Sequence, residues 1–201
     1  MRIILASSNQ GKIKELTKLL PEYEVVAYSD LIGVFEIIED GNSFKENAII
    51  KVKAVDKKLQ ENKYKDYIVI ADDSGLTVSV FNNEPGIYSA RYAGVGASDE
   101  ENNQKIIRNL NKMGLKEADA YYTACLAIGY KGRIYTTHGW MYGKVIDEPR
   151  GDNGFGYDPI FIPKNHKNTL GELDENIKKN IGHRSKGLNL ALKIIRSLLK
   201  Q

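Results

Sequence analysis

The pattern of apolar and polar positions predicts a chain in which strands and helices follow one another. Apolar runs at residues 2–6 and 24–28 predict two strands, and runs at 120–130 and 133–146 predict a hairpin. Amphipathic helices are expected over residues 13–20, 43–62 and 98–114, and from residue 184 toward the C-terminus, and a short polar helix is expected over residues 173–181. The pattern contains no internal repeat and no interdomain linker, which favours a single domain.

The most informative stretch runs from residue 67 to residue 81. A β-branched run leads into Asp72 and Asp73, Ser74 and Gly75 follow, and apolar residues then alternate again. We expect a strand, an acidic turn and a second strand. Asp, Ser and Gly also suit an ordinary hairpin turn, so that interpretation stays open. Adjacent carboxylates repel and usually need a cation, and hard oxygen ligands favour Mg²⁺.

Two further segments suggest ligand contacts. The polar segment 7–12 (SSNQGK) lies between a predicted strand and the start of a helix, where backbone N–H groups and the helix dipole attract phosphates. It does not have the spacing of a Walker A loop. In the segment 151–163, glycines beside aromatic residues allow close backbone approach to a flat ligand, and Phe155 could stack on a base. A tight loop that enters a strand is the alternative.

Composition and charge narrow the class of protein. The chain has 201 residues, of which 42% are hydrophobic and 27% charged, so we expect a packed core and no extended disorder. No apolar run approaches the ~20 residues of a membrane span, and the first run is too short for a signal peptide. The single cysteine, Cys125, excludes an intrachain disulfide and fits a reducing cytoplasm. Net charge is +3, and the basic residues gather after residue 163, which suits an anionic ligand.

Six segments, taken together and in order, resemble the inosine triphosphate pyrophosphatase family, the pyrophosphatases of non-canonical purine nucleoside triphosphates. The resemblance extends from residue 2 to about residue 196. The segments are SSNQGK (7–12), SFKENA (43–48), ADDSGL (71–76), PGIYSARYAG (85–94), FGYDPIF (155–161) and HR (183–184).

The resemblance implies an α/β fold: a long, mixed, curved β-sheet with flanking helices and two lobes around a central cleft, forming one domain over residues 1–201. It implies hydrolysis of ITP, dITP and XTP to the monophosphate and pyrophosphate, which cleanses the nucleotide pool. It also implies Mg²⁺, one or more per subunit, and a cytoplasmic homodimer. The partner is then a small-molecule nucleoside triphosphate, and neither nucleic acid nor a membrane is expected as a partner.

Carried over residue by residue, the resemblance also implies a set of site residues. Glu39 and Asp72 match metal-binding acids, and Asp73 matches the acid that acts as base and also touches the metal. Lys53 matches a phosphate-facing lysine and Ser74 a substrate contact. The triphosphate loop would comprise Ser7, Ser8, Asn9, Gln10, Gly11 and Lys12, and the nucleobase pocket Phe155, Gly156, Tyr157, Asp158, Lys178, His183 and Arg184.

One position departs from the family pattern. Gly182 stands where the family usually has Ser, so any base contact of that hydroxyl is lost.

A Maf-type nucleotide pyrophosphatase, acting on pyrimidine or modified nucleotides, shares the opening motif but not ADDSGL or FGYDPIF. A haloacid-dehalogenase-type phosphatase would need Asp-x-Asp rather than adjacent acids. A non-enzymatic nucleic-acid binder would rest only on the basic C-terminal third.

Overall fold

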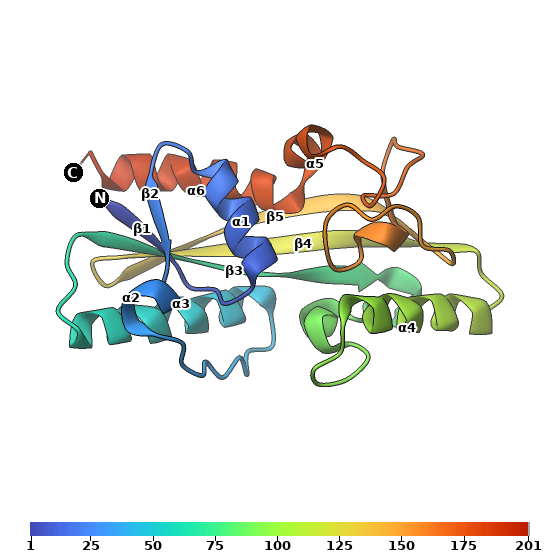
Figure 1. The fold of residues 1–201 in the computed structure, drawn as a ribbon, viewed down its shortest axis with the longest axis horizontal. Helices are drawn as coiled ribbons and strands as arrows, with labels where there is room; N and C mark the ends of the chain where they lie inside the picture. The colour runs from blue at the N-terminus through green and yellow to red at the C-terminus, as the bar shows by residue number, and fades with distance from the viewer. Residues whose placement is uncertain (201) are drawn as a thin grey trace. The chain divides into compact units, whose positions relative to one another are not determined.

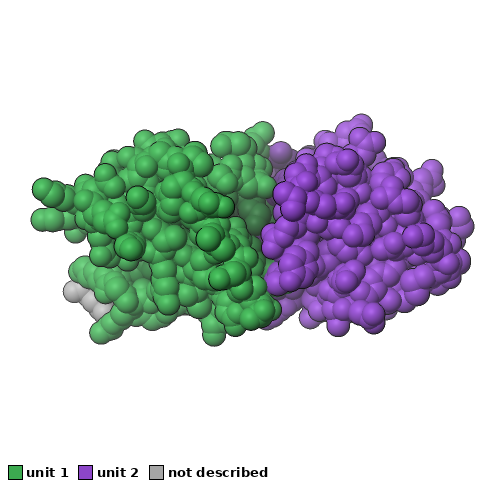
Figure 2. All heavy atoms as spheres, turned by 90° about the horizontal axis from the view of Figure 1, so that it is seen from below, with its two compact units in different colours: residues 1–73, 124–139, 184–201 green, residues 74–123, 140–183 purple. Residues whose placement is uncertain are grey.

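The computed structural model describes residues 1–200, which fold into two compact units (Figure 2). Unit 1 comprises residues 1–73, 124–139 and the segment from residue 184 onward. Unit 2 comprises residues 74–123 and 140–183. The chain therefore passes between the units several times, and neither unit is a continuous stretch of sequence.

The strands form one mixed sheet in the order β2-β1-β3-β4-β5-β6. Strand β1 pairs in parallel with β2 and β3, whereas β6 pairs antiparallel with β5. Strands β4 and β5 are joined by two residues, Lys131 and Gly132, so the predicted hairpin is confirmed. The strands are β1 (Arg2–Leu5), β2 (Glu24–Ala27), β3 (Tyr67–Val78), β4 (Glu117–Tyr130), β5 (Arg133–Ile146) and β6 (Phe161–Pro163). The expected mixed α/β sheet is present.

Side-chain caps explain where the main helices begin. Asn9 and Ser43 accept hydrogen bonds from the backbone N–H groups of the first turns of α1 and α3, and Ser98 forms a complete capping box with Glu101 at α4. The helices are α1 (Gln10–Leu19), α2 (Ser29–Ile32), α3 (Phe44–Glu61), α4 (Asp99–Lys112), α5 (Glu175–Ile181) and α6 (His183–Leu198) (Figure 1). Over residues 1–200, no helix combines the length and apolarity that a membrane span requires.

Unit 1 has an apolar layer on each face of its part of the sheet. Because strand side chains alternate between faces, Ile3 and Leu5 of β1 join one cluster, while Ile4 joins the other. The first cluster also contains residues of α1 and α6, and the second contains residues of α3. Figure 1 shows α6 on one side of these strands and α3 on the other. Unit 2 has one cluster, which joins the end of β3 to α4 and β6.

The predicted acidic turn within residues 67–81 is wrong, because Tyr67–Val78 is one continuous strand. Gly75 allows close packing there: a Cβ at this residue would lie 2.3 Å from Oγ of Ser89. That hydroxyl accepts a hydrogen bond from the backbone N–H of Leu76 at 2.9 Å. Sheet pairing and tertiary contacts thus override the local turn preference of Asp, Ser and Gly.

Candidate functional site

Asp72 and Asp73 lie next to each other in β3 and therefore point to opposite faces of the strand. The alternation places Asp72 on the side of Ile70, whose cluster includes α1 and α6. It places Asp73 on the side of Ala71, whose cluster includes α3. The two carboxylates consequently find different partners in unit 1 and need not share one cation.

Asp72 is held by two basic side chains. Its Oδ2 lies 2.9 Å from Nζ of Lys12 on α1 and 3.3 Å from Nε of Arg184 on α6. Arg184 is fixed in turn by Glu15 of α1, whose Oε2 lies 2.9 Å from Nη1. Burial alone would raise the pKa of Asp72, but the charges of Lys12 and Arg184 outweigh it and hold that pKa well below its usual range. Asp72 is therefore ionised in the folded protein and binds the side chains of Lys12 and Arg184.

Asp73 shares a lysine with Glu39. Nζ of Lys51 lies 2.8 Å from Oδ1 of Asp73 and 2.9 Å from Oε2 of Glu39, and Asp73 is only 8% exposed. The second oxygen, Oδ2, is buried and accepts no hydrogen bond from residues 1–200. Burial raises the pKa of Asp73 above its ordinary value, although Lys51 and Lys12 oppose the shift. A buried carboxylate with an available oxygen and a raised pKa is suited to act as a general base.

The predicted triphosphate loop surrounds the start of α1. Oδ1 of Asn9 accepts a hydrogen bond from the backbone N–H of Lys12 at 3.0 Å, and Oγ of Ser7 accepts one from the N–H of Asn9 at 3.2 Å. Ser8, Asn9 and Gln10 are exposed. The loop thus presents a helix N-terminus to solvent, with Lys12 beside it, and this arrangement attracts anions.

In unit 2, Lys178 and Asp158 secure the glycine-rich segment 151–158. Nζ of Lys178 lies 2.9 Å from Oδ2 of Asp158 and donates a hydrogen bond to the carbonyl of Asn153 at 3.0 Å. Gly154 has φ +96, and a Cβ there would overlap Oδ2 of Asp158. Gly154 is therefore required both for its backbone conformation and for space.

The aromatic residues of the predicted base pocket differ in accessibility. Phe155 is partly buried, whereas Tyr157 is only 4% exposed and its hydroxyl donates a hydrogen bond to the carbonyl of Ser89 at 2.7 Å. Tyr157 belongs to the apolar cluster of unit 2, and its burial raises its pKa. His183 stacks on Tyr122 with ring centroids 4.7 Å apart. Of the two aromatic side chains in FGYD, only that of Phe155 is partly accessible to a ligand.

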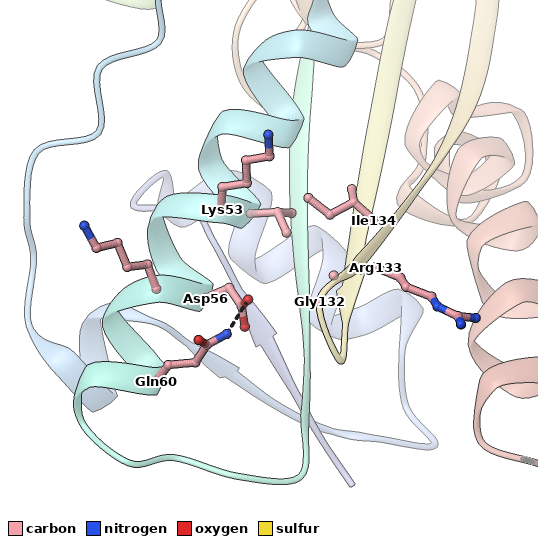
Figure 3. A pocket seen from close by; sticks show the side chains of 9 residues that line it. Lys53, Asp56, Gln60, Gly132, Arg133 and Ile134 are labelled. Carbon is pink, nitrogen blue, oxygen red and sulfur yellow. Dashed lines mark hydrogen bonds between the residues drawn. The ribbon is translucent and has the colours of Figure 1, made fainter.

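Lys53 does not join these acids, although it was predicted to face phosphate. It is exposed and lines a cavity of about 220 Å³ near the β4–β5 turn, together with Gln60 and Arg133 (Figure 3). Lys51 contacts the acids instead. Its position on α3, three residues after the buried Ala48, is a signal that the sequence analysis did not use.

The remaining predicted residues are also accounted for. In unit 1 the structure forms two ion-pair groups around neighbouring residues of β3: Asp72 with Lys12 and Arg184, and Asp73 with Glu39 through Lys51. Glu15, which pairs with Arg184, and Lys51 were not predicted from the sequence. Glu15 could have been found because it lies three residues after Lys12 on the same helical face. Ser74 is partly buried and Gly156 lies in the unit 2 segment.

The predicted metal-binding acids are Glu39, Asp72 and Asp73. In the part of the chain that the structure describes, no group of three or more His, Cys, Asp or Glu is arranged to hold a metal ion. Glu39 and Asp73 do converge on one cationic atom, Nζ of Lys51, while Asp72 pairs elsewhere. Two carboxylates with phosphate and water oxygens are a normal Mg²⁺ environment, so Glu39 and Asp73 fit this ion better than all three acids together.

Comparisons with known proteins agree with the sequence motifs. Residues 3–194 match the Ham1 family. The chain is 55% identical to a dITP/XTP pyrophosphatase of Aliarcobacter butzleri, over 99% of this chain and 100% of the relative. A dITP/XTP pyrophosphatase of Sulfurimonas denitrificans is 56% identical, over 98% and 100%.

Solved structures match over the same length. The Staphylococcus aureus Ham1 protein is 38% identical, with a TM-score of 0.83 over 98% of this chain and 99% of its own. A HAM1 protein from Coxiella burnetii is 35% identical, with a TM-score of 0.85 over 98% and 99%. The chain therefore belongs to the Ham1 family, and the family resemblance expected from its sequence motifs is confirmed.

Proposed function

We propose that this protein hydrolyses the non-canonical purine nucleoside triphosphates ITP, dITP and XTP to the monophosphate and pyrophosphate. The observation that carries the proposal is Asp73: a buried carboxylate with a raised pKa, held by Lys51, next in sequence to Asp72, which pairs with Lys12. Relatives about 55% identical over their full length are named dITP/XTP pyrophosphatases, which supports this substrate class.

The start of α1 would bind the triphosphate. Its N-terminal backbone groups favour anions, and Lys12 adds a charge that is already held beside Asp72 at 2.9 Å. Nε of Arg184 lies 3.3 Å from the same carboxylate. We therefore propose that Arg184 also contacts the phosphates.

Asp73 would act as the general base. Its Oδ2 has no hydrogen bond from another described residue and can accept the proton of the attacking water. Lys51 holds the opposite oxygen, Oδ1, and so fixes the carboxylate. A positioned base of this kind contributes typically about 10²–10⁴-fold to the rate.

Glu39 and Asp73 would hold Mg²⁺. When bound, this ion supplies positive charge that neutralises the phosphate oxygens of the substrate. Lys51 now provides the positive charge between the two carboxylates, at 2.8 and 2.9 Å. These residues therefore already bind a cationic group.

The segment 151–158 of unit 2 would bind the purine. Phe155 can stack on the ring, and Lys178, held by Asp158, can donate a hydrogen bond to a 6-oxo group. Adenine carries an amino donor at that position, so a donor held there would disfavour it. His183 is only 6% exposed and its ring stacks on Tyr122, which limits it to edge contacts.

Two parts of the proposal concern assembly and location. A homodimer and a cytoplasmic site of action are supported by the family resemblance, and the single buried Cys125 suits a reducing compartment. Light scattering of the purified protein would test the dimer, which predicts twice the 22.6 kDa of one chain. A mass of one chain at micromolar concentration would contradict it.

The substrate class is tested by kcat/KM for ITP, dITP, XTP, GTP, ATP and dUTP. The proposal predicts that the first three exceed ATP by at least about 10²-fold, because a donor that faces the 6-position cannot be satisfied by an amino group. A preference for dUTP or for another pyrimidine would favour a Maf-type activity instead. Equal turnover of ATP and ITP would remove the base-selection part of the proposal.

A further inference from the structure

Helix α4 holds both backbone polar groups of Gly156, the residue between Phe155 and Tyr157. Oδ2 of Asp99 accepts a hydrogen bond from the N–H of Gly156 at 2.6 Å. Nδ2 of Asn103 donates a hydrogen bond to the carbonyl oxygen of Gly156 at 3.0 Å. All of these residues belong to unit 2. We call this pair of contacts the α4 clamp.

The clamp is built on a rigid support. Asp99 and Asn103 are four residues apart on α4 and therefore lie on the same helical face. The Ser98–Glu101 capping box fixes the start of the helix, directly beside Asp99. Apolar residues of α4 pack into the unit 2 cluster. A site built on such an element is more precise than one built on a loop alone.

The two contacts fix the backbone conformation at Gly156. Gly156 has φ +63, in the left-handed region. Glycine adopts positive and negative φ about equally, so the residue itself does not select this conformation. Asn103 is 7% exposed, and its Oδ1 accepts no hydrogen bond from the described chain, so the contact with Gly156 orients its amide. The Asp99 contact involves a charged acceptor and is therefore stronger than a neutral hydrogen bond.

We propose that Asp99 and Asn103 are positioning residues that fix the backbone at Gly156 and thereby place the Phe155 ring for the purine. The inference rests on the proposed function, in which this segment binds the base. The clamp acts from α4, whereas the Lys178–Asp158 pair secures the segment from α5. Neither Asp99 nor Asn103 needs to touch the substrate.

The test compares two alanine variants with two matched controls. Asp99→Ala and Asn103→Ala remove the clamp. Glu100→Ala removes a neighbouring exposed acid from the same first turn. Asn102→Ala removes a buried Asn, 3% exposed, that instead bonds the backbone of Ala93 and Ala90. For each protein, thermal unfolding, KM and kcat for ITP, and inhibition by inorganic tripolyphosphate, which lacks a base, are measured.

The clamp variants should raise KM for ITP by about 10- to 100-fold, since the Phe155 ring would no longer be held where it stacks on the base. Inhibition by tripolyphosphate should stay unchanged, because tripolyphosphate has no base and does not contact the segment 151–158. Asp99→Asn, which keeps an acceptor oxygen, should recover most of the wild-type KM. Both controls should keep the wild-type KM for ITP, even where Asn102→Ala lowers the unfolding temperature.

Two results would overturn the inference. One is a wild-type KM for ITP in folded Asp99→Ala and Asn103→Ala proteins. The other is an equal loss of ITP and tripolyphosphate binding, which would indicate general damage rather than a misplaced base segment. Asp99 is exposed, so its variant tests the inference even if Asn103→Ala does not fold. Failure of the wild-type protein to hydrolyse ITP would instead refute the proposed function.

Discussion

Replacing Lys51 by Met tests the network around Asp73, and Lys53→Met provides a control on the same helix. Methionine keeps the length of the lysine side chain but removes its charge. Lys51 is buried between Asp73 and Glu39, whereas Lys53 is exposed and contacts neither acid. The two substitutions change the same residue type only two positions apart, so differences between them report on the environment of Lys51.

The structure sets the size of the effect. Removal of one partner of a buried ion pair costs about 3–5 kcal/mol, because the remaining charge is buried without compensation. Asp73 is 8% exposed, so its ion pair with Lys51 counts as buried. The Glu39 side chain is 35% exposed, so its pairing with Lys51 adds little to the free energy of unfolding. A loss of about 3 kcal/mol would lower the unfolding temperature of a chain of this size by about 6–12 °C. Lys53→Met should stay within about 0.5 kcal/mol of wild type.

The loss should depend on pH with a definite sign. Without Lys51, the pKa of Asp73 in the folded state rises further above its unfolded value, because burial is no longer opposed by that charge. The folded state then binds more protons than the unfolded state between these two pKa values, so stability falls as pH rises through that window. The difference between wild type and Lys51→Met should therefore be smaller at pH 5 than at pH 8.

Thermal and urea unfolding at pH 5 and pH 8, with ITP turnover at pH 8, measure these effects. Lys51→Met should be less stable, more so at pH 8, and should lose most of its activity. The reasoning is refuted if Lys51→Met and Lys53→Met have the same stability and turnover. A stability loss that grows toward pH 5 would show that Asp73 does not bear the uncompensated charge.

Three further substitutions test individual roles. Asp73→Asn should fold but lose roughly 10²-fold or more in kcat, as expected for a general base, and normal turnover would remove that role. Glu39→Gln should raise the Mg²⁺ concentration needed for half-maximal rate, whereas the exposed Glu36→Gln should not; identical metal titrations would place the ion elsewhere. Gly182 has φ −60 and ψ 142, which any residue adopts, so Gly182→Ser should fold normally. If the usual family hydroxyl contacts the base, this variant should lower KM for ITP by about two- to tenfold, and an unchanged KM would argue against that contact.

The motifs were sufficient to predict the family and the mixed α/β sheet, because several segments of defined chemistry occur in a fixed order. The helix starts at Ser43 and Ser98 were also predictable, since caps act on their own first turn. The hairpin at Lys131 and Gly132 follows from a two-residue connection between two strand-like runs. Features governed by neighbouring residues were therefore visible in the sequence.

Features governed by distant residues were not visible. The acid pair was expected in a turn, but Lys12 and Lys51, far away in the sequence, supply the countercharges that let Asp72 and Asp73 lie within a strand. The family resemblance implies that Arg184 belongs to the base pocket, and the sequence did not predict its ion pairs with Asp72 and Glu15. The partners of these residues depend on where their side chains point in the fold, which the identity of a residue does not reveal.

The reaction itself is tested most directly by product analysis of ITP hydrolysis in ¹⁸O-labelled water with Mg²⁺. Attack of water on the α-phosphorus predicts IMP and pyrophosphate in equal amounts, with the label in the phosphate of IMP. Asp73→Asn should slow the formation of both products together. Orthophosphate and IDP as the first products would contradict the account, and so would label in pyrophosphate rather than in IMP.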